Sequence, residues 1–145
     1  MSVAKAFFDT NILLCMYGGG DPTKQAKAAE LFRVQTRTAR AVLSTQVVQE
    51  FYAVATRKLG MARDVAGRIV RSLLGLPLVV IDADSILTAL AVEERYRISF
   101  WDALIVAAAE AARAQALYTE DLNDGQQYGQ VVARNPFHEQ GDCRA

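Results

Sequence analysis

The sequence is poor in cysteine and histidine. Among its 145 residues there are two cysteines and one histidine. Cys15 and Cys143 lie far apart with no partner at a metal-binding spacing, which excludes a disulfide framework and a cysteine-rich zinc site. With His138 as the sole histidine, any metal ion must be held mainly by oxygen ligands. Such ligands suit hard cations such as Mg²⁺.

Long hydrophobic runs are also missing. A membrane-spanning helix needs roughly 18 or more uninterrupted apolar residues, and no segment of the chain has them. An apolar patch at residues 12–17 follows Lys5, but Asp9 and Asn11 interrupt the region where a signal peptide would be continuous. The sequence therefore predicts a cytoplasmic protein without a membrane partner.

The chain has no net charge, because 16 basic residues balance 16 acidic ones. The charges are unevenly distributed: residues 24–71 carry ten basic and three acidic side chains, and residues 82–124 carry nine acidic and three basic ones. This polarity favours an anionic partner on one surface. Solvated helix faces would explain the same pattern, and both interpretations stay open.

Length and composition indicate one domain. A chain of 145 residues with 52% hydrophobic residues has the size of a common single domain. We expect that domain to cover residues 1–137. The segment 138–145, HEQGDCRA, is polar and is predicted to form a flexible tail.

Short apolar segments alternate with longer helical patterns along the chain. The apolar segments are nearly continuous, which is typical of strands buried on both faces of a parallel sheet. We predict strands at residues 3–8, 41–44, 78–81, 116–119 and 130–133. Helices are predicted at residues 12–17, 23–36, 46–58, 62–74, 84–95 and 101–114. The alternation predicts a three-layer α/β/α fold with a central parallel sheet of four to five strands.

Four acidic residues lie at or near the start of an element beside an apolar run: Asp9, Glu50, Asp102 and Asp121. In an open α/β sheet, ligands bind beyond the carboxyl ends of the strands, so acids in these places favour a cation site. Simpler roles exist for three of them. Asp9 suits the N-cap of the helix that follows it. Asp102 completes a capping-box pattern that starts at Ser99, and Asp121 lies in a polar turn.

Glu50 is harder to explain without a ligand. A helical glutamate usually finds a lysine or arginine three or four residues away. The residues at those positions here are uncharged: Gln46, Val47, Ala53 and Val54. A carboxylate at the edge of a packed helix face is costly to desolvate unless it is paired or bound to a metal. Taken together, the four acids favour a divalent-cation site over four separate structural roles.

Four segments occur in order along the chain: FFDTN, STQVVQEFYAVATRK, SFWDALIVAAA, and LYTEDLNDGQ followed by ARNPF. Together they resemble the ordered motifs of PIN-domain nucleases, and most of all the VapC-type toxins of bacterial and archaeal toxin–antitoxin pairs. The resemblance extends from Val3 to Phe137. It implies a PIN-like domain, a catalytic site of four acids, and Mg²⁺ or Mn²⁺ as the metal.

The resemblance also implies a role for each site residue. The family's four acids match Asp9, Glu50, Asp102 and Asp121. Asp9 and Asp102 are expected to bind the metal directly, Asp121 to complete the site or hold a second ion, and Glu50 to bind through water or orient the nucleophile. Three residues are expected to support them: Thr10 as a hydroxyl partner of the first acid or of a phosphate, Asn11 as a turn or cap residue, and Asp124 as an acid that shares or replaces the role of Asp121.

The function implied is metal-dependent hydrolysis of RNA phosphodiester bonds by the toxin of a toxin–antitoxin pair. The expected partners are an RNA substrate, a separate antitoxin and a second copy of the chain in a homodimer. The basic helices within residues 24–71 are expected to contact the RNA backbone, and the stretch 51–74 to dock the antitoxin. Two alternatives stay open: a catalytically silent PIN-like module that binds RNA or protein, and an aspartate-based phosphatase-like α/β domain.

Overall fold

A single six-stranded sheet organises the chain, in the strand order β3-β2-β1-β4-β6-β5. The computed structural model describes residues 4–18 and 20–137. The strands are β1 Lys5–Phe8, β2 Ala41–Ser44, β3 Leu78–Val79, β4 Ala114–Tyr118, β5 Gln127–Tyr128 and β6 Val131–Arg134. β1 pairs in parallel with β2 and β4, and parallel pairing continues to β3 on one side and β6 on the other. The two-residue strand β5 runs antiparallel to β6.

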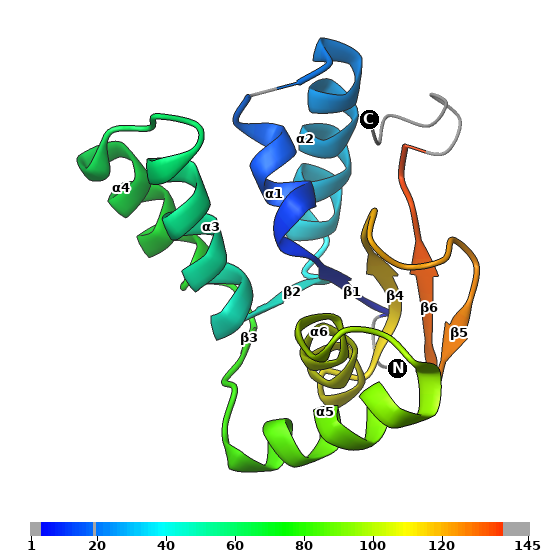
Figure 1. Cartoon of the computed structure of the whole chain (residues 1–145). Coiled ribbons are helices and arrows are strands. Elements are labelled where there is room, and N and C mark those ends of the chain that lie inside the picture. Colours follow the sequence, from blue (N-terminus) through cyan, green and yellow to red (C-terminus); the bar gives the residue numbers. More distant parts are fainter. Residues whose placement is uncertain (1–3, 19, 138–145) are drawn as a thin grey trace.

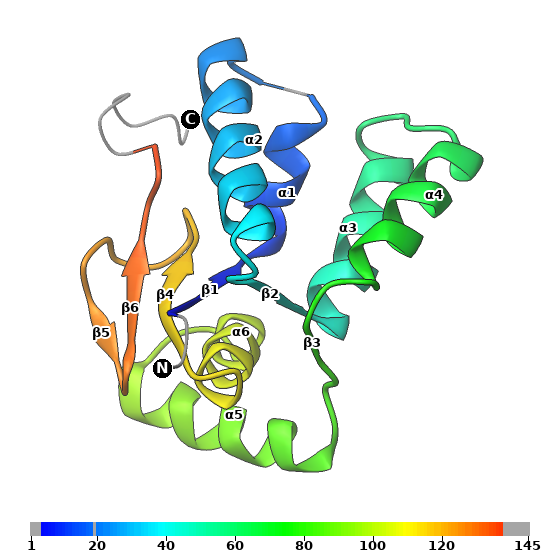
Figure 2. The ribbon, with the colours of Figure 1, turned by 180° about the vertical axis from the view of Figure 1, so that it is seen from behind.

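Helices cover both faces of this sheet. They are α1 Thr10–Met16, α2 Pro22–Arg37, α3 Thr45–Arg57, α4 Arg63–Leu73, α5 Ala83–Tyr96 and α6 Phe100–Ala111. In Figure 1, α1 and α2 lie on one side of the sheet and α5 and α6 on the other, while α3 and α4 extend as a pair beside the β3 edge. Figure 2 shows the same arrangement from behind. The predicted three-layer α/β/α fold with a parallel sheet is therefore confirmed.

The buried core encloses the whole of strand β2 and most of the apolar helix α6. All four residues of β2 are buried, as expected for a strand covered on both faces. Helix α6 has seven consecutive buried residues, at 103–109. A helix that is apolar on every side must be enclosed, and its alanines allow close approach to the sheet and to α5. This packing fixes the position of the first turn of α6, which carries Asp102.

The structure moves some predicted boundaries. The helix predicted at 101–114 ends at Ala111, and the chain turns at Arg113, whose φ of 57° is left-handed, before β4 begins. The alanine-rich run contains no glycine or proline to mark that end. The strand predicted at 78–81 covers only Leu78–Val79, because the chain turns away toward the next helix cap. The short strand β5 was not predicted, since two residues show no periodicity.

Two predictions concern residues outside the described ones: the strand predicted at 3–8 does so at its first residue, and the flexible tail predicted at 138–145 does so entirely. None of the described helices combines the length and apolar character that a membrane span requires.

Candidate metal centre

Asp9 lies directly after β1 and is the N-cap of α1. Its Oδ1 accepts a hydrogen bond from the Thr10 N–H at 2.7 Å, and its Oδ2 accepts one from the Thr119 hydroxyl at 2.8 Å. The Asp9 N–H in turn donates to the Tyr118 carbonyl at 3.0 Å, so the ends of β1 and β4 are tied together. The cap role expected for Asp9 is therefore present, and the side chain is only 5% exposed.

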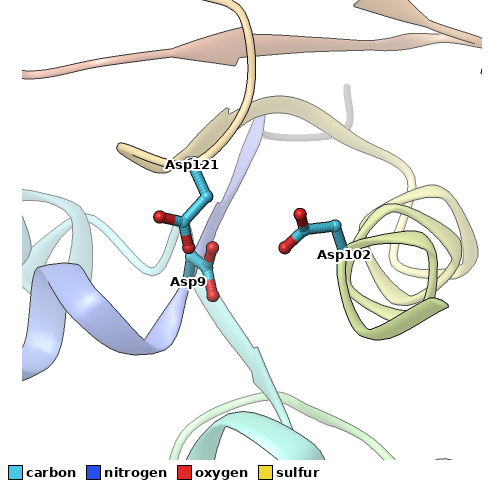
Figure 3. Close-up of side chains that lie close together, drawn as sticks. All are labelled: Asp9, Asp102 and Asp121. Atoms are coloured by element: carbon cyan, nitrogen blue, oxygen red, sulfur yellow. The ribbon is translucent and has the colours of Figure 1, made fainter. Parts of the chain in front are cut away.

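Asp102 and Asp121 bring their carboxylates to the same place. One carboxylate oxygen from each of Asp9, Asp102 and Asp121 lies within 4.8 Å of the others. In Figure 3, the Asp102 side chain points from α6 toward Asp9 and Asp121. Since β1 and β4 are neighbouring parallel strands, this carboxylate group lies at the carboxyl edge of the sheet. Asp9 is buried, Asp102 is partly buried and Asp121 is exposed, so the group opens to solvent on the Asp121 side.

Burial and mutual repulsion disfavour the charged forms of these acids. Burial raises the pKa of Asp9 from 3.8 to about 7; its hydrogen bonds from Thr119 and Thr10 lower this pKa, and the nearby charges of Asp121 and Asp102 raise it. Burial also raises the pKa of Asp102, the Ser99 side chain lowers it, and the charge of Glu50 raises it further. A bound cation reverses this preference, because it favours the ionised carboxylates.

Thr119 holds two members of the carboxylate group. Its hydroxyl donates to Asp9 Oδ2 and accepts from the Asp121 N–H at 3.0 Å. The residue is fully buried. Sequence reasoning missed Thr119, although the available signal was a hydroxyl residue two positions before an acid at a strand end, where Ser and Thr often make local turns.

Glu50 lies beside the carboxylate group and not within it. Its Oε2 accepts from the Thr10 hydroxyl at 2.9 Å, and its Oε1 accepts from Gln46 Nε2 at 3.1 Å. Gln46 Nε2 also donates to the Trp101 carbonyl at 3.3 Å, which links α3 to the start of α6. From the sequence, Gln46 is only an uncharged residue one helical turn before Glu50. The structure makes it the hydrogen-bond partner of that acid.

The three residues expected to support the site, Thr10, Asn11 and Asp124, differ in their hydrogen bonds. Thr10 contacts Asp9 through its backbone and Glu50 through its hydroxyl. Asn11 lies within α1 and is not its cap, and its buried Oδ1 has no hydrogen-bond partner in the described part of the chain. Asp124 Oδ1 accepts from the Asn135 N–H at 2.9 Å. The group of three carboxylates contains Asp121 and does not include Asp124.

Glu120 points away from the centre and secures its loop. Its carboxylate pairs with Lys24 of α2 at 2.5 Å, and both side chains are largely buried. The Lys24 ammonium also lies 4.9 Å from the centre of the Phe137 ring. Of two adjacent acids, Glu120 therefore anchors the segment after β4 to α2, while Asp121 faces the other carboxylates.

The donor set fits a hard divalent cation. Three carboxylates from separate elements meet within one small group, and oxygen ligands of this kind are those that Mg²⁺ and Mn²⁺ prefer. Two of the three have raised pKa values, chiefly because burial disfavours their charged forms and to a smaller extent because acidic neighbours repel them. Such shifts are common at functional sites.

The sequence was compared with family models and with curated proteins. A family model described as "PIN domain" matches residues 6–124. A comparison with curated protein sequences finds no match.

The fold is also similar to solved structures. A toxin–antitoxin complex from Klebsiella pneumoniae is 23% identical, with 91% of this chain and 98% of that chain covered and a TM-score of 0.66. VapC20 of Mycobacterium tuberculosis, described as a toxin that cleaves the sarcin–ricin loop, is 21% identical, with coverage of 88% and 99% and a TM-score of 0.67. DNA-bound VapBC from Salmonella typhimurium is 16% identical, with coverage of 92% and 99% and a TM-score of 0.67. At these identities the similarity shows a shared fold.

Proposed function

The chain belongs to the PIN domain family, and from this premise we propose that it is a divalent-metal-dependent endoribonuclease acting as the toxin of a toxin–antitoxin pair. The observation that carries the proposal is the meeting of Asp9, Asp102 and Asp121 at the carboxyl edge of the sheet. Similar folds in VapC and VapBC structures support the toxin assignment. An RNA substrate fits the expected location in the cytoplasm.

Asp9, Asp102 and Asp121 are the residues that would hold Mg²⁺ or Mn²⁺. When bound, the cation would polarise the phosphodiester and lower the pKa of a nearby water. The exposed side of the group, at Asp121, leaves room for an RNA backbone to approach.

The residues of the chain keep the carboxylates in place and supply a base. Thr119 and the Thr10 N–H fix the orientation of Asp9. Hydrogen bonds from Thr10 and Gln46 hold the two oxygens of Glu50 in place. Each oxygen keeps a further lone pair, so Glu50 is our candidate to orient a water molecule and accept its proton. A carboxylate base fits a chain whose sole histidine, His138, belongs to the C-terminal segment.

Cleavage of RNA by purified protein tests this proposal. We expect cleavage with Mg²⁺ or Mn²⁺, none with chelator, and loss of cleavage in Asp9→Asn and Asp102→Asn proteins that melt cooperatively. Asp124→Asn is the matched control, since Asp124 lies in the same loop outside the carboxylate group, and it should retain cleavage. Equal activity in the parent and in both site variants would overturn the assignment.

The same experiment separates the alternatives. RNA binding without cleavage under any metal condition would identify a catalytically silent module. Metal-stimulated hydrolysis of a phosphomonoester without RNA cleavage would identify a phosphatase-like domain.

We further propose that a separate antitoxin docks on α3 and α4. Residues 51–74 carry five basic side chains and one acidic one. A cavity of about 580 Å³ between the two helices is lined by Tyr52, Asp64, Arg63, Arg68 and Arg71, among others, and guanidinium groups pair well with carboxylates. Charge reversal at the three arginines should weaken antitoxin binding, measured by calorimetry; unchanged binding would exclude this surface.

We also propose that the toxin forms a homodimer. Light scattering that shows only monomer would exclude the dimer.

A further inference from the structure

We propose that Trp101 is a stacking platform for an unpaired RNA base next to the carboxylate group. This inference rests on the proposed ribonuclease function and deepens it, because it names unstacked, single-stranded RNA as the substrate form. Three features of Trp101 support it: the exposure of the indole, its attachment to a fixed backbone, and its place in the helix turn that carries Asp102.

The Trp101 side chain is 63% exposed, which makes it the most exposed aromatic residue in the described part of the chain. Tyr17 and Tyr52 are 39% and 37% exposed, and Phe51 is fully buried. Trp buries a large apolar area when it packs, so leaving it in water sacrifices that stabilisation. Its contact with Phe100, at 5.5 Å between ring centres and an interplanar angle of 72°, leaves most of the indole open.

The backbone that carries this side chain is held in place. Ser99 caps α6 by accepting from the Asp102 N–H at 3.1 Å. The Trp101 carbonyl accepts from Gln46 Nε2, and Gln46 is itself buried. The indole is therefore attached to a rigid helix start, which reduces the conformational entropy lost on binding.

The position of Trp101 indicates which part of an RNA substrate it would contact. Trp101 and Asp102 are consecutive residues in the first turn of α6, so the indole leaves the helix one position before the Asp102 side chain, about 100° around the axis. The Asp102 carboxylate belongs to the group proposed to hold the metal ion that polarises the scissile phosphodiester. The bases attached to that phosphate must lie close by. A flat aromatic surface stacks on any base, but only when the base is not already paired and stacked in a duplex. We infer that this surface favours single-stranded RNA with little base preference.

Trp101 is the sole tryptophan of the chain, so tryptophan fluorescence, excited selectively over the tyrosines, reports on this side chain alone. The titration uses the full chain in chelator, so that nothing is cleaved, with short oligoadenylate as the probe. We expect quenching and a blue shift of the emission. Duplex RNA of mixed sequence and inorganic phosphate should produce neither effect.

Affinity measured with labelled oligoadenylate provides the second readout. Trp101→Ala should weaken binding roughly 5- to 150-fold, as expected for the loss of one base–aromatic stack, and Trp101→Phe should restore most of it. Leu87→Ala is the matched control, because Leu87 is 64% exposed on α5, and it should bind like the parent. Thermal melting establishes that each variant is folded.

Failure of the stacking role can be distinguished from failure of the nuclease assignment. If Trp101→Ala binds oligoadenylate as the parent does while Asp9→Asn still abolishes cleavage, the stacking role is wrong and the nuclease assignment stands. If the emission shifts only with protein concentration, together with self-association in light scattering, Trp101 is a protein contact and the proposal is overturned. If the parent neither cleaves RNA nor binds the probe, both proposals are overturned.

Discussion

Asp9 combines a structural and a chemical role in one side chain. A carboxylate offers about four lone-pair positions, and the hydrogen bonds from Thr10 and Thr119 use one on each oxygen of Asp9. The remaining positions are available to a cation. Capping and metal binding are therefore compatible at this residue, although the sequence presents them as competing explanations.

The raised pKa of Asp9 predicts how the metal-free fold responds to pH. The pKa rises from 3.8 to about 7 on folding, chiefly through burial. Between these values the folded protein retains a proton that the unfolded chain has released, so the free energy of unfolding falls as the pH rises through this window. The loss is on the order of 4 kcal/mol at pH above 7. Denaturant unfolding in chelator, at a series of pH values, measures it.

Asp9→Asn is the control for this pH dependence. The variant cannot ionise at this position, so its free energy of unfolding should change much less between pH 4 and 7. An equally steep loss of stability in the variant would assign the effect to other groups.

Thr119 should matter to both stability and metal binding. Thr119→Val keeps the shape but leaves a buried Asp9 oxygen and the Asp121 N–H without their hydroxyl partner. We expect a loss of about 1–3 kcal/mol in the free energy of unfolding. Because the Thr119 hydrogen bond lowers the pKa of Asp9, its removal should also shift the pH midpoint of Mg²⁺ binding upward. Thr119→Ser should behave like the parent; a normal pH midpoint in Thr119→Val would contradict this role.

At the scale of elements, the centre depends on contacts between the starts of three helices. Thr10 of α1 bonds to Glu50 of α3, and Gln46 of α3 bonds to both Glu50 and the Trp101 carbonyl of α6. Each helix supplies an acid at or near its first turns, and these bonds set the distances between the helices. The arrangement predicts that Gln46 acts through Glu50.

A double-mutant cycle tests the link between Gln46 and Glu50. Gln46→Leu removes the donor to Glu50 and should lower the free energy of unfolding by about 1 kcal/mol and reduce RNA cleavage. In a Glu50→Gln background the additional effect on cleavage should largely disappear, because the two residues share one interaction. Gln49→Leu, an exposed change on the same helix, is the control. Fully additive effects on cleavage would contradict the link.

At the scale of the whole molecule, the carboxylate group is a source of instability that a cation relieves. Mg²⁺ or Mn²⁺ should raise the free energy of unfolding by about 2.7 kcal/mol at a hundredfold excess over the dissociation constant. Asp102→Asn should gain much less from metal and should be at least as stable as the parent without it, because one repelling charge is gone. Melting curves with and without metal measure both effects. A destabilised variant with an unchanged metal response would make Asp102 a structural residue.

The arrangement of layers followed closely from the sequence. The segment 41–44 is a strand at the predicted bounds, and the other predicted strands and helices are present with shifted ends. Hydrophobic periodicity and apolar runs are local properties, so they predict which segments are helical or extended. They do not mark the end of α6 or reveal β5, since the alanine-rich run has no breaker and a two-residue strand has no period.

In the candidate metal centre, too, the sequence predicts the positions of the acids along the chain, and the tertiary structure decides their contacts. The sequence by itself determined that Asp9, Glu50, Asp102 and Asp121 lie at the starts of elements beside apolar runs, because parallel strands present such positions at one edge. Only the tertiary structure decided that Asp121 joins Asp9 and Asp102 while Asp124 binds elsewhere, that Glu50 lies beside them, and that the Trp101 indole is exposed. The bond from Thr119 to Asp9 spans 110 positions and that from Gln46 to Trp101 spans 55. Such contacts depend on which elements become neighbours after folding, and no local pattern encodes them.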